Sequence, residues 1–152
     1  MTTVRAAIVQ SEPAASLDEG LHRTEALVRE ATSSGASLVV FPETWLPGYP
    51  TWLDVCRDVA LWDHPPVKRV YRRMAEQSVA VPSEAARTLA EIAATNGITL
   101  VVGVVERVDN GAGQGTLYNT LLTPIMSVTP CRRAQSRRNW PPSPATSMLA
   151  AA

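Results

Sequence analysis

The feature that most constrains the fold is a change of apolar period within the first 41 residues. Residues 4–10 (VRAAIVQ) form a short apolar run of the kind found in buried strands. Residues 17–31 place apolar side chains near helical spacing among charged ones, with Ser16 as a candidate N-cap. Residues 37–41 (SLVVF) are again continuously apolar and are followed by Pro42. Strand, helix and strand in this order predict a right-handed βαβ unit with parallel strands.

The pattern continues as α/β sequence as far as residue 123. Residues 44–66 are rich in Trp, Pro and Gly, which predicts a long structured loop with about one helical turn. Beyond it we expect two helices, then two strands joined by a turn into a hairpin. These elements are residues 67–78, 83–96, 98–105 and 116–123, with the turn at residues 109–115.

The last part of the chain has a different composition. Asp and Glu are absent from Asn110 onward, and residues 124–152 contain five prolines and four arginines without an apolar period. Such a segment cannot bury enough surface to offset the entropy lost on ordering. We therefore divide the chain into one α/β domain, residues 1–123, and an irregular tail, residues 124–152.

Overall composition excludes several classes of function. Fourteen basic and fourteen acidic residues leave no net field to attract nucleic acid or an anionic membrane. No apolar run approaches the ~18 residues that span a bilayer. The two cysteines, Cys56 and Cys131, show no CxxC or zinc-ligand spacing, so neither a disulfide framework nor a metal site is indicated. A reducing cytoplasm fits this composition best.

The segment FPETWLPGYP, residues 41–50, carries the candidate chemistry. Glu43 directly follows a predicted strand, and ligands of open α/β sheets usually bind beyond the carboxyl ends of strands. Proline stiffens the strand end, and aromatic residues follow the carboxylate. A carboxylate in this setting is suited to be desolvated and to act as a base.

The stretch FPETWLPGYPTW resembles the glutamate motif of the nitrilase superfamily of carbon–nitrogen hydrolases. Its PGYP-Trp continuation is more similar to nitrilases than to the amidase branches. Residues 78–79, 99–107 (TLVVGVVER) and 115–120 (GTLYNT) resemble the next blocks of the family in order, so the resemblance covers about residues 4–123.

This resemblance implies the N-terminal half of an α-β-β-α sandwich and a Glu-Lys-Cys catalytic set. Glu43 matches the general base, while cysteine attacks a nitrile and lysine stabilises the developing negative charge. A small-molecule nitrile is converted to carboxylic acid and ammonia, with no metal or organic cofactor. The resemblance also implies a homo-oligomer for the full-length protein.

Five further residues have two interpretations each. Four residues of the loop either pack against the loop itself or form a wall of the substrate site, since aromatic side chains commonly do both. These are Trp45, Tyr49, Pro50 and Trp52. Glu106 is a second candidate polar group, but a charge that closes a strand is more often solvated. We expect it to lie outside the site.

The family pattern breaks after Asn119-Thr120. The catalytic lysine is expected near position 136, where the chain has Gln135-Ser136-Arg137, and Lys68 is its only lysine. Neither Cys56 nor Cys131 lies in a sequence that resembles the nucleophile block. We expect residues 124–152 to be an out-of-frame or truncated product and the chain as given to be inactive.

Two alternatives remain open at this point. One is an amidase-branch hydrolase, which would share the fold and the catalytic residues. The other is a non-catalytic module that pairs with another chain through an exposed apolar sheet face.

Overall fold

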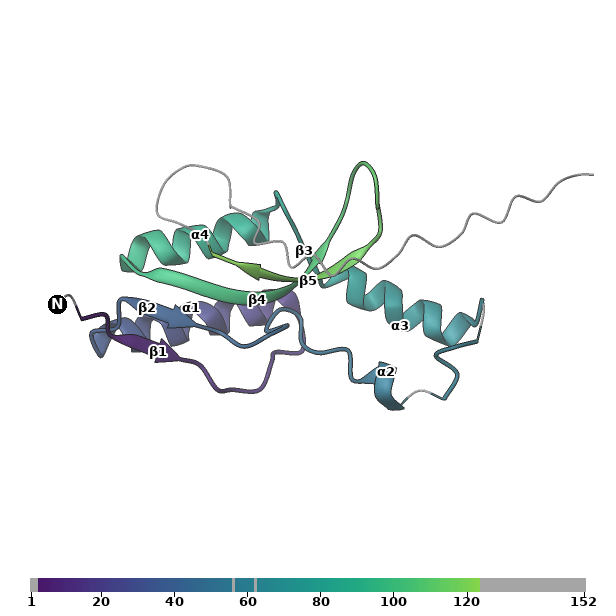
Figure 1. Ribbon diagram of the computed structural model, residues 1–152, viewed down its shortest axis with the longest axis horizontal. Coiled ribbons are helices and arrows are strands. Elements are labelled where there is room, and N and C mark those ends of the chain that lie inside the picture. Colours follow the sequence, from purple (N-terminus) through teal and green to yellow (C-terminus); the bar gives the residue numbers. More distant parts are fainter. Residues whose placement is uncertain (1–2, 56, 62, 124–152) are drawn as a thin grey trace, which may run out of the picture.

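A computed structural model of the protein describes residues 3–55, 57–61 and 63–123 as a mixed α/β fold (Figure 1). Helices and strands follow one another as β1 (Ala6–Ile8), α1 (Leu17–Ser33), β2 (Leu38–Val40), α2 (Trp52–Val55), α3 (Pro65–Glu76), β3 (Val79–Ala80), α4 (Glu84–Asn96), β4 (Thr99–Arg107) and β5 (Leu117–Leu122). The α/β class predicted from the apolar pattern is confirmed. The predicted irregular tail, together with Cys56 and Cys131, lies outside the described residues.

The first unit is the predicted strand–helix–strand. β1 and β2 pair in parallel, with Ala7 opposite Val39. Helix α1 begins after Ser16, whose hydroxyl accepts a hydrogen bond from the backbone N–H of Glu19 at 3.3 Å. It ends before Gly35, whose φ of 84° is one that glycine adopts without steric cost.

β4 is the central strand of the sheet. Its first residues pair in parallel with β2, and its last residues pair in parallel with β3. β5 returns antiparallel along the second half of β4, with Val105 opposite Asn119, so the predicted hairpin is confirmed. The sheet has a fifth strand that we did not predict, because β3 is only two residues long and carries no readable period.

Helices α1 and α4 cover one face of this sheet (Figure 1). Val28 of α1 and Leu89 of α4 are almost fully buried, as is Leu100 of β4 between the helices and the sheet. Each such side chain contributes about 1.5–3 kcal/mol by leaving water. α4 begins after Ser83, whose hydroxyl accepts a hydrogen bond from the backbone N–H of Ala86 at 3.2 Å. This apolar interface is the core of the protein.

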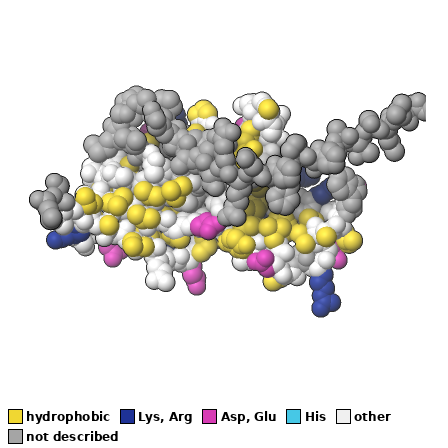
Figure 2. Space-filling view, in the orientation of Figure 1, with side chains coloured by type: hydrophobic (Ala, Val, Ile, Leu, Met, Phe, Trp, Pro, Cys, Tyr) yellow, Lys and Arg dark blue, Asp and Glu magenta, His cyan; other side chains and the backbone are white. Residues whose placement is uncertain are grey.

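The other face of the sheet is open in the described part of the chain. Ile8 of β1 is 82% exposed and Leu121 of β5 is 45% exposed. Figure 2 shows hydrophobic side chains gathered along this face. Parallel strands are normally covered on both faces. The described residues therefore supply one helix layer and one sheet of the expected four-layer sandwich.

The region between β2 and α4 holds the remaining helices. α2 is the single helical turn expected in the long loop. α3 starts two residues earlier than predicted, because Pro65 and Pro66 occupy its first turn, where a missing N–H costs nothing. None of the helices described here is long and apolar enough to cross a membrane.

Candidate active site

Glu43 lies just past the C-terminal end of β2, as predicted. Phe41 N still donates to Val101 O at 2.8 Å, and Leu46 forms a parallel bridge with Val104 of β4. Between these two contacts the chain crosses Gly103 so closely that a Cβ there would lie 2.6 Å from the Cα of Glu43. The backbone that carries the carboxylate therefore rests directly on the central strand.

The residue after Glu43 has a conformation that is rare for its type. Thr44 is buried and has a φ of 50°, which a β-branched residue seldom adopts. Its hydroxyl donates to the carbonyl of Glu43 at 2.8 Å, and its own carbonyl accepts from Gly48 N at 2.7 Å. Backbone strain of this kind costs about 1–3 kcal/mol and clusters at functional sites.

Trp45 packs into the core. Its side chain is 1% exposed, and its indole Nε1 donates to the hydroxyl of Thr24 at 2.8 Å. Its ring centroid lies 5.1 Å from that of Phe41. Of the two interpretations given for Trp45, loop packing therefore describes this residue, and we do not place it in the candidate site.

Glu43 lines a cavity of about 370 Å³ at this end of the sheet. Three of the four predicted wall residues, Tyr49, Pro50 and Trp52, line it as well. The cavity is mostly aromatic and apolar, and apart from Thr44 its other lining residues come from α2, α3, β4 and β5. The full lining is Glu43, Thr44, Tyr49, Pro50, Trp52, Leu53, Tyr71, Met74, Val105, Leu117, Tyr118 and Asn119.

Among the described residues, the carboxylate of Glu43 has one hydrogen-bond partner. Asn119 of β5 donates a hydrogen bond from its side-chain Nδ2 to Oε1 of Glu43. The glutamate is exposed in this structure, so the desolvation expected from the motif is not found.

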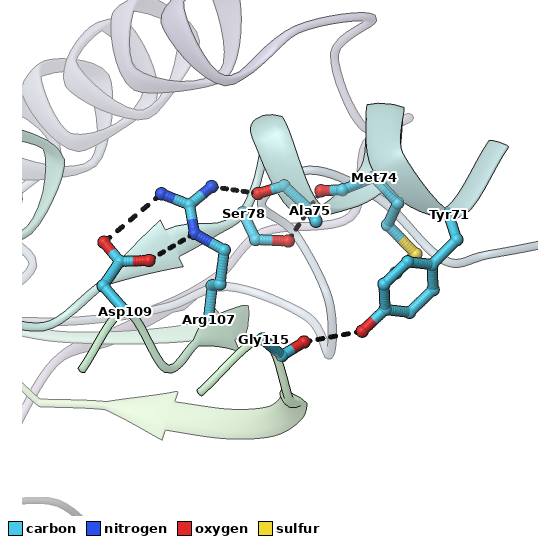
Figure 3. Close-up of polar contacts among 7 residues, drawn as sticks. All are labelled: Tyr71, Met74, Ala75, Ser78, Arg107, Asp109 and Gly115. Carbon is cyan, nitrogen blue, oxygen red and sulfur yellow. Dashed lines mark hydrogen bonds and ion pairs between the residues drawn. The ribbon is translucent and has the colours of Figure 1, made fainter. Parts of the chain in front are cut away.

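Helix α3 closes one side of the cavity with Tyr71 and Met74 (Figure 3). The hydroxyl of Tyr71 donates to the carbonyl of Gly115, in the loop between β4 and β5, at 2.7 Å. At the end of the helix, Arg107 of β4 donates from Nη1 to the carbonyl of Ala75. These bonds connect α3 to the β4–β5 hairpin, so the two walls of the cavity are joined.

Arg107 is itself oriented by a carboxylate (Figure 3). Its Nε lies 2.6 Å from Oδ1 of Asp109 and its Nη2 lies 3.4 Å from Oδ2. The hydrogen bond from Arg107 lowers the pKa of Asp109, and the same bond raises the pKa of Arg107. The pair keeps the guanidinium in place to bind the end of α3.

Glu106 differs from its expectation. We expected a solvated charge, but the side chain is only 6% exposed. Thr120 donates its hydroxyl to Oε2 of Glu106 at 2.8 Å. Neighbouring residues of a strand point to opposite faces, so Glu106 lies on the helix side while Val105 lines the cavity. The solvation prediction was wrong because Glu106 lies inside the sheet, where β4 pairs with β3 on one side and with β5 on the other.

Lys68 does not reach the candidate site. It lies on the exposed side of α3, forms an ion pair with Asp63 and does not line the cavity. Within the part of the chain that is described, no group of three His, Cys, Asp or Glu side chains has the arrangement of a metal site. The candidate reactive group of the cavity is thus the Glu43 carboxylate, to which the side-chain amide of Asn119 is hydrogen-bonded.

Asn119, Tyr71 and Met74 were not predicted as site residues. Tyr71 and Met74 come from a helix whose orientation depends on long-range contacts that no local pattern reports. Asn119 did leave a signal, because asparagine is depleted in strands and here lies in the middle of one.

Comparison with known proteins places the chain among hydrolases. A family model described as carbon–nitrogen hydrolase matches residues 5–145. The match runs past Thr123, the boundary predicted from composition, into residues that the structure does not describe.

Among curated proteins, an arylacetonitrilase of Aspergillus niger is 36% identical over 122 residues, which are 78% of this chain and 34% of that protein. A cyanide hydratase of Microdochium sorghi is 36% identical over 132 residues, 85% of this chain and 33% of that protein. The chain thus spans about a third of the length of these relatives.

The fold is also found among solved structures. The crystal structure of a carbon–nitrogen hydrolase from Helicobacter pylori matches with a TM-score of 0.53 and 16% identity. The match covers 86% of this chain and 39% of that one. At this identity the likeness establishes the fold, in agreement with the half-sandwich described above.

Proposed function

Because the chain belongs to the carbon–nitrogen hydrolase family, we propose that it carries the general base of a nitrile hydrolase and that Glu43 is this base. The reaction consumes a nitrile and two waters and yields a carboxylic acid and ammonia. The observation that supports this most is the position of Glu43 on an aromatic-lined cavity at the carboxyl end of the parallel strands.

The chemistry explains why a carboxylate is needed there. A cysteine thiol is mostly protonated at neutral pH, and the thiolate is the nucleophile. Glu43 would take the thiol proton as sulfur bonds to the nitrile carbon and would pass it to the nitrile nitrogen, whose developing charge a lysine cation would stabilise. Water then adds to the thioimidate, ammonia leaves, and a second water cleaves the thioester to the acid. In each hydrolytic step Glu43 would accept a proton from water and return it to the leaving group, first the ammonia nitrogen and then the cysteine sulfur.

The reaction uses a glutamate, a lysine and a cysteine. Of these three, the 152-residue chain has only the glutamate, Glu43, in a block that resembles the family. Its single lysine, Lys68, pairs with Asp63 away from the cavity. We therefore propose that this chain alone forms no thioimidate. Turnover needs the lysine and cysteine blocks, which a restored reading frame after Thr123 would supply.

Two features favour a nitrile over an amide substrate. The PGYP-Trp segment, residues 47–52, is similar to nitrilases, and two curated relatives are named for nitrile or cyanide chemistry. Within nitriles, the lining by Tyr49, Trp52 and Tyr71 favours an aryl group, because aromatic rings bury large areas against each other.

The test is a substrate panel with the frame-restored full-length chain. Ammonia release is measured from phenylacetonitrile, propionitrile, cyanide and phenylacetamide at equal concentrations. We expect release from nitriles, with the highest kcat/KM for phenylacetonitrile. Turnover of phenylacetamide without turnover of any nitrile would replace the nitrilase assignment by the amidase one.

A further inference from the structure

The carboxylate of Glu43 has a dedicated partner on a distant strand. Asn119 Nδ2 donates to Oε1 of Glu43 across a separation of 76 residues. Among the residues described, no other side chain is hydrogen-bonded to this carboxylate. We infer that Asn119 is a positioning residue that sets the direction of the Glu43 carboxylate. This inference rests on the proposed function of Glu43.

Glu43 needs such a partner because little else fixes its side chain. Its backbone is well held, between the close approach to Gly103 and the unusual conformation of Thr44. The side chain, however, is exposed, and an unrestrained glutamate side chain samples many rotamers. A base must lie within hydrogen-bond reach of the proton that it accepts.

Asn119 is suited to provide this restraint. It lies within β5, in register opposite Val105 of β4, so its backbone is fixed by the antiparallel ladder. Val105 and Asn119 both line the cavity that Glu43 lines. An asparagine amide donates N–H without carrying a charge. A lysine or arginine here would instead compete with the proton that a base has to accept.

The neighbouring residue shows that the contact is specific to one face of β5. Thr120 points to the opposite face and donates its hydroxyl to the buried Glu106 at 2.8 Å. β5 thus binds two glutamates, one on each face of the sheet. Only the Asn119–Glu43 pair lies on the cavity.

The contact itself is tested in the 152-residue chain, where no activity is needed. In ¹⁵N-labelled protein, Glu43→Gln should move the side-chain amide signals of Asn119, because the charged acceptor is lost. The amide of Asn96, which donates to Ile92 O at 2.8 Å within α4, is the internal control and should not move. Unmoved Asn119 signals would overturn the inference.

The positioning role is tested in the frame-restored full-length chain with two substitutions of similar shape. Asn119→Leu removes the donor, and Asn119→Asp places a second carboxylate against Glu43. We expect kcat to fall on the order of 10²-fold for Asn119→Leu and further for Asn119→Asp, with KM and the melting temperature near those of the parent. The control Leu121→Ala, on the same face of β5, should keep the parental kcat.

A failure of the positioning role of Asn119 can be distinguished from a failure of the proposed function of Glu43. If both Asn119 variants keep kcat within about twofold of the parent while Glu43→Gln is inactive, the positioning role is wrong and the proposed base stands. If Glu43→Gln is itself active, the proposed function fails first.

Discussion

A Cβ atom on Gly103 would lie 2.6 Å from the Cα of Glu43 and 2.4 Å from the carbonyl oxygen of Pro42. Both neighbours are backbone atoms, which cannot rotate away as a side chain can. Gly103→Ala should therefore lower the free energy of unfolding by about 1–3 kcal/mol, as other overpacked sites do. Urea denaturation measures this directly.

The control for this substitution is Thr99→Ala, at an exposed position of the same strand. We expect it to change the free energy of unfolding by no more than about 0.5 kcal/mol. Equal stability of Gly103→Ala and the parent would mean that the Glu43 segment does not rest on β4 as described.

The buried hydrogen bond between Trp45 and Thr24 gives a second prediction. Thr24→Val keeps the shape of the side chain but leaves the indole N–H without an acceptor, which costs about 1–3 kcal/mol. Thr32→Val is the matched control. Both hydroxyls donate to the carbonyl four residues earlier in α1, but only Thr24 also accepts from a buried tryptophan.

Thermal or urea denaturation of the two valine variants separates these contributions. Thr24→Ser, which keeps the hydroxyl, should recover part of the loss. If Thr24→Val and Thr32→Val were destabilised equally, the bond to Trp45 would contribute nothing.

Local patterns predicted the elements well because each carries its own signals. The predicted cap Ser16 lies where α1 begins, and Ser83 and Gly97 lie at the two ends of α4. The parallel order also followed from sequence, since β1 and β2 are joined through α1. The strand β3 was missed because two residues are too few to establish a period.

The site was predicted less completely, for physical reasons. Glu43 could be found because it follows a strand directly. Trp45, Tyr49 and Trp52 look alike in sequence, yet Trp45 packs on Phe41 in the core while the other two line the cavity. The side that each aromatic residue faces is set by the folded loop, which includes the positive φ of Thr44, and neither composition nor period reports this.

The ion pair between Arg107 and Asp109 predicts a pH dependence. The pKa of Asp109 is lowered from its ordinary value of 3.8 by the hydrogen bond from Arg107. The contribution of the ionised Asp109 to the free energy of unfolding is therefore present above pH 3.8. It is lost as the pH falls through the lowered pKa of the folded state. Arg107 stays charged throughout, since its pKa is raised.

This dependence is measured by comparing the parent with Asp109→Asn from pH 7 to pH 2. The parent should be more stable at neutral pH, and the difference should shrink as the pH falls below 3.8. Asp54→Asn, at an exposed position of α2, is the control and should show no such convergence. A difference that stayed constant from pH 7 to pH 2 would exclude the ionised carboxylate as its source.

The open face of the sheet predicts that the 152-residue chain exposes apolar surface in solution. Ile8 and Leu121 are 82% and 45% exposed on that face. Replacing both with threonine keeps β propensity while removing apolar area, and should lower the binding of a hydrophobic dye. The control is Val55→Thr on α2, where the side chain is 77% exposed but lies away from the sheet.

Dye fluorescence measures the exposed apolar surface, and sedimentation velocity measures self-association. We expect the double substitution to reduce both the fluorescence and any self-association, and Val55→Thr to leave them near the parental values. An equal reduction by Val55→Thr would show that the sheet face is not the surface responsible.

The most direct test of Glu43 as the general base is ammonia release by Glu43→Gln in the frame-restored full-length chain. The amide keeps the shape of the side chain and removes its ability to accept a proton, so the fold should persist. We predict a loss of at least about 10²-fold in kcat/KM for phenylacetonitrile, with a circular dichroism spectrum and melting temperature equal to those of the parent. A folded Glu43→Gln protein that releases ammonia at the parental rate would contradict the assignment.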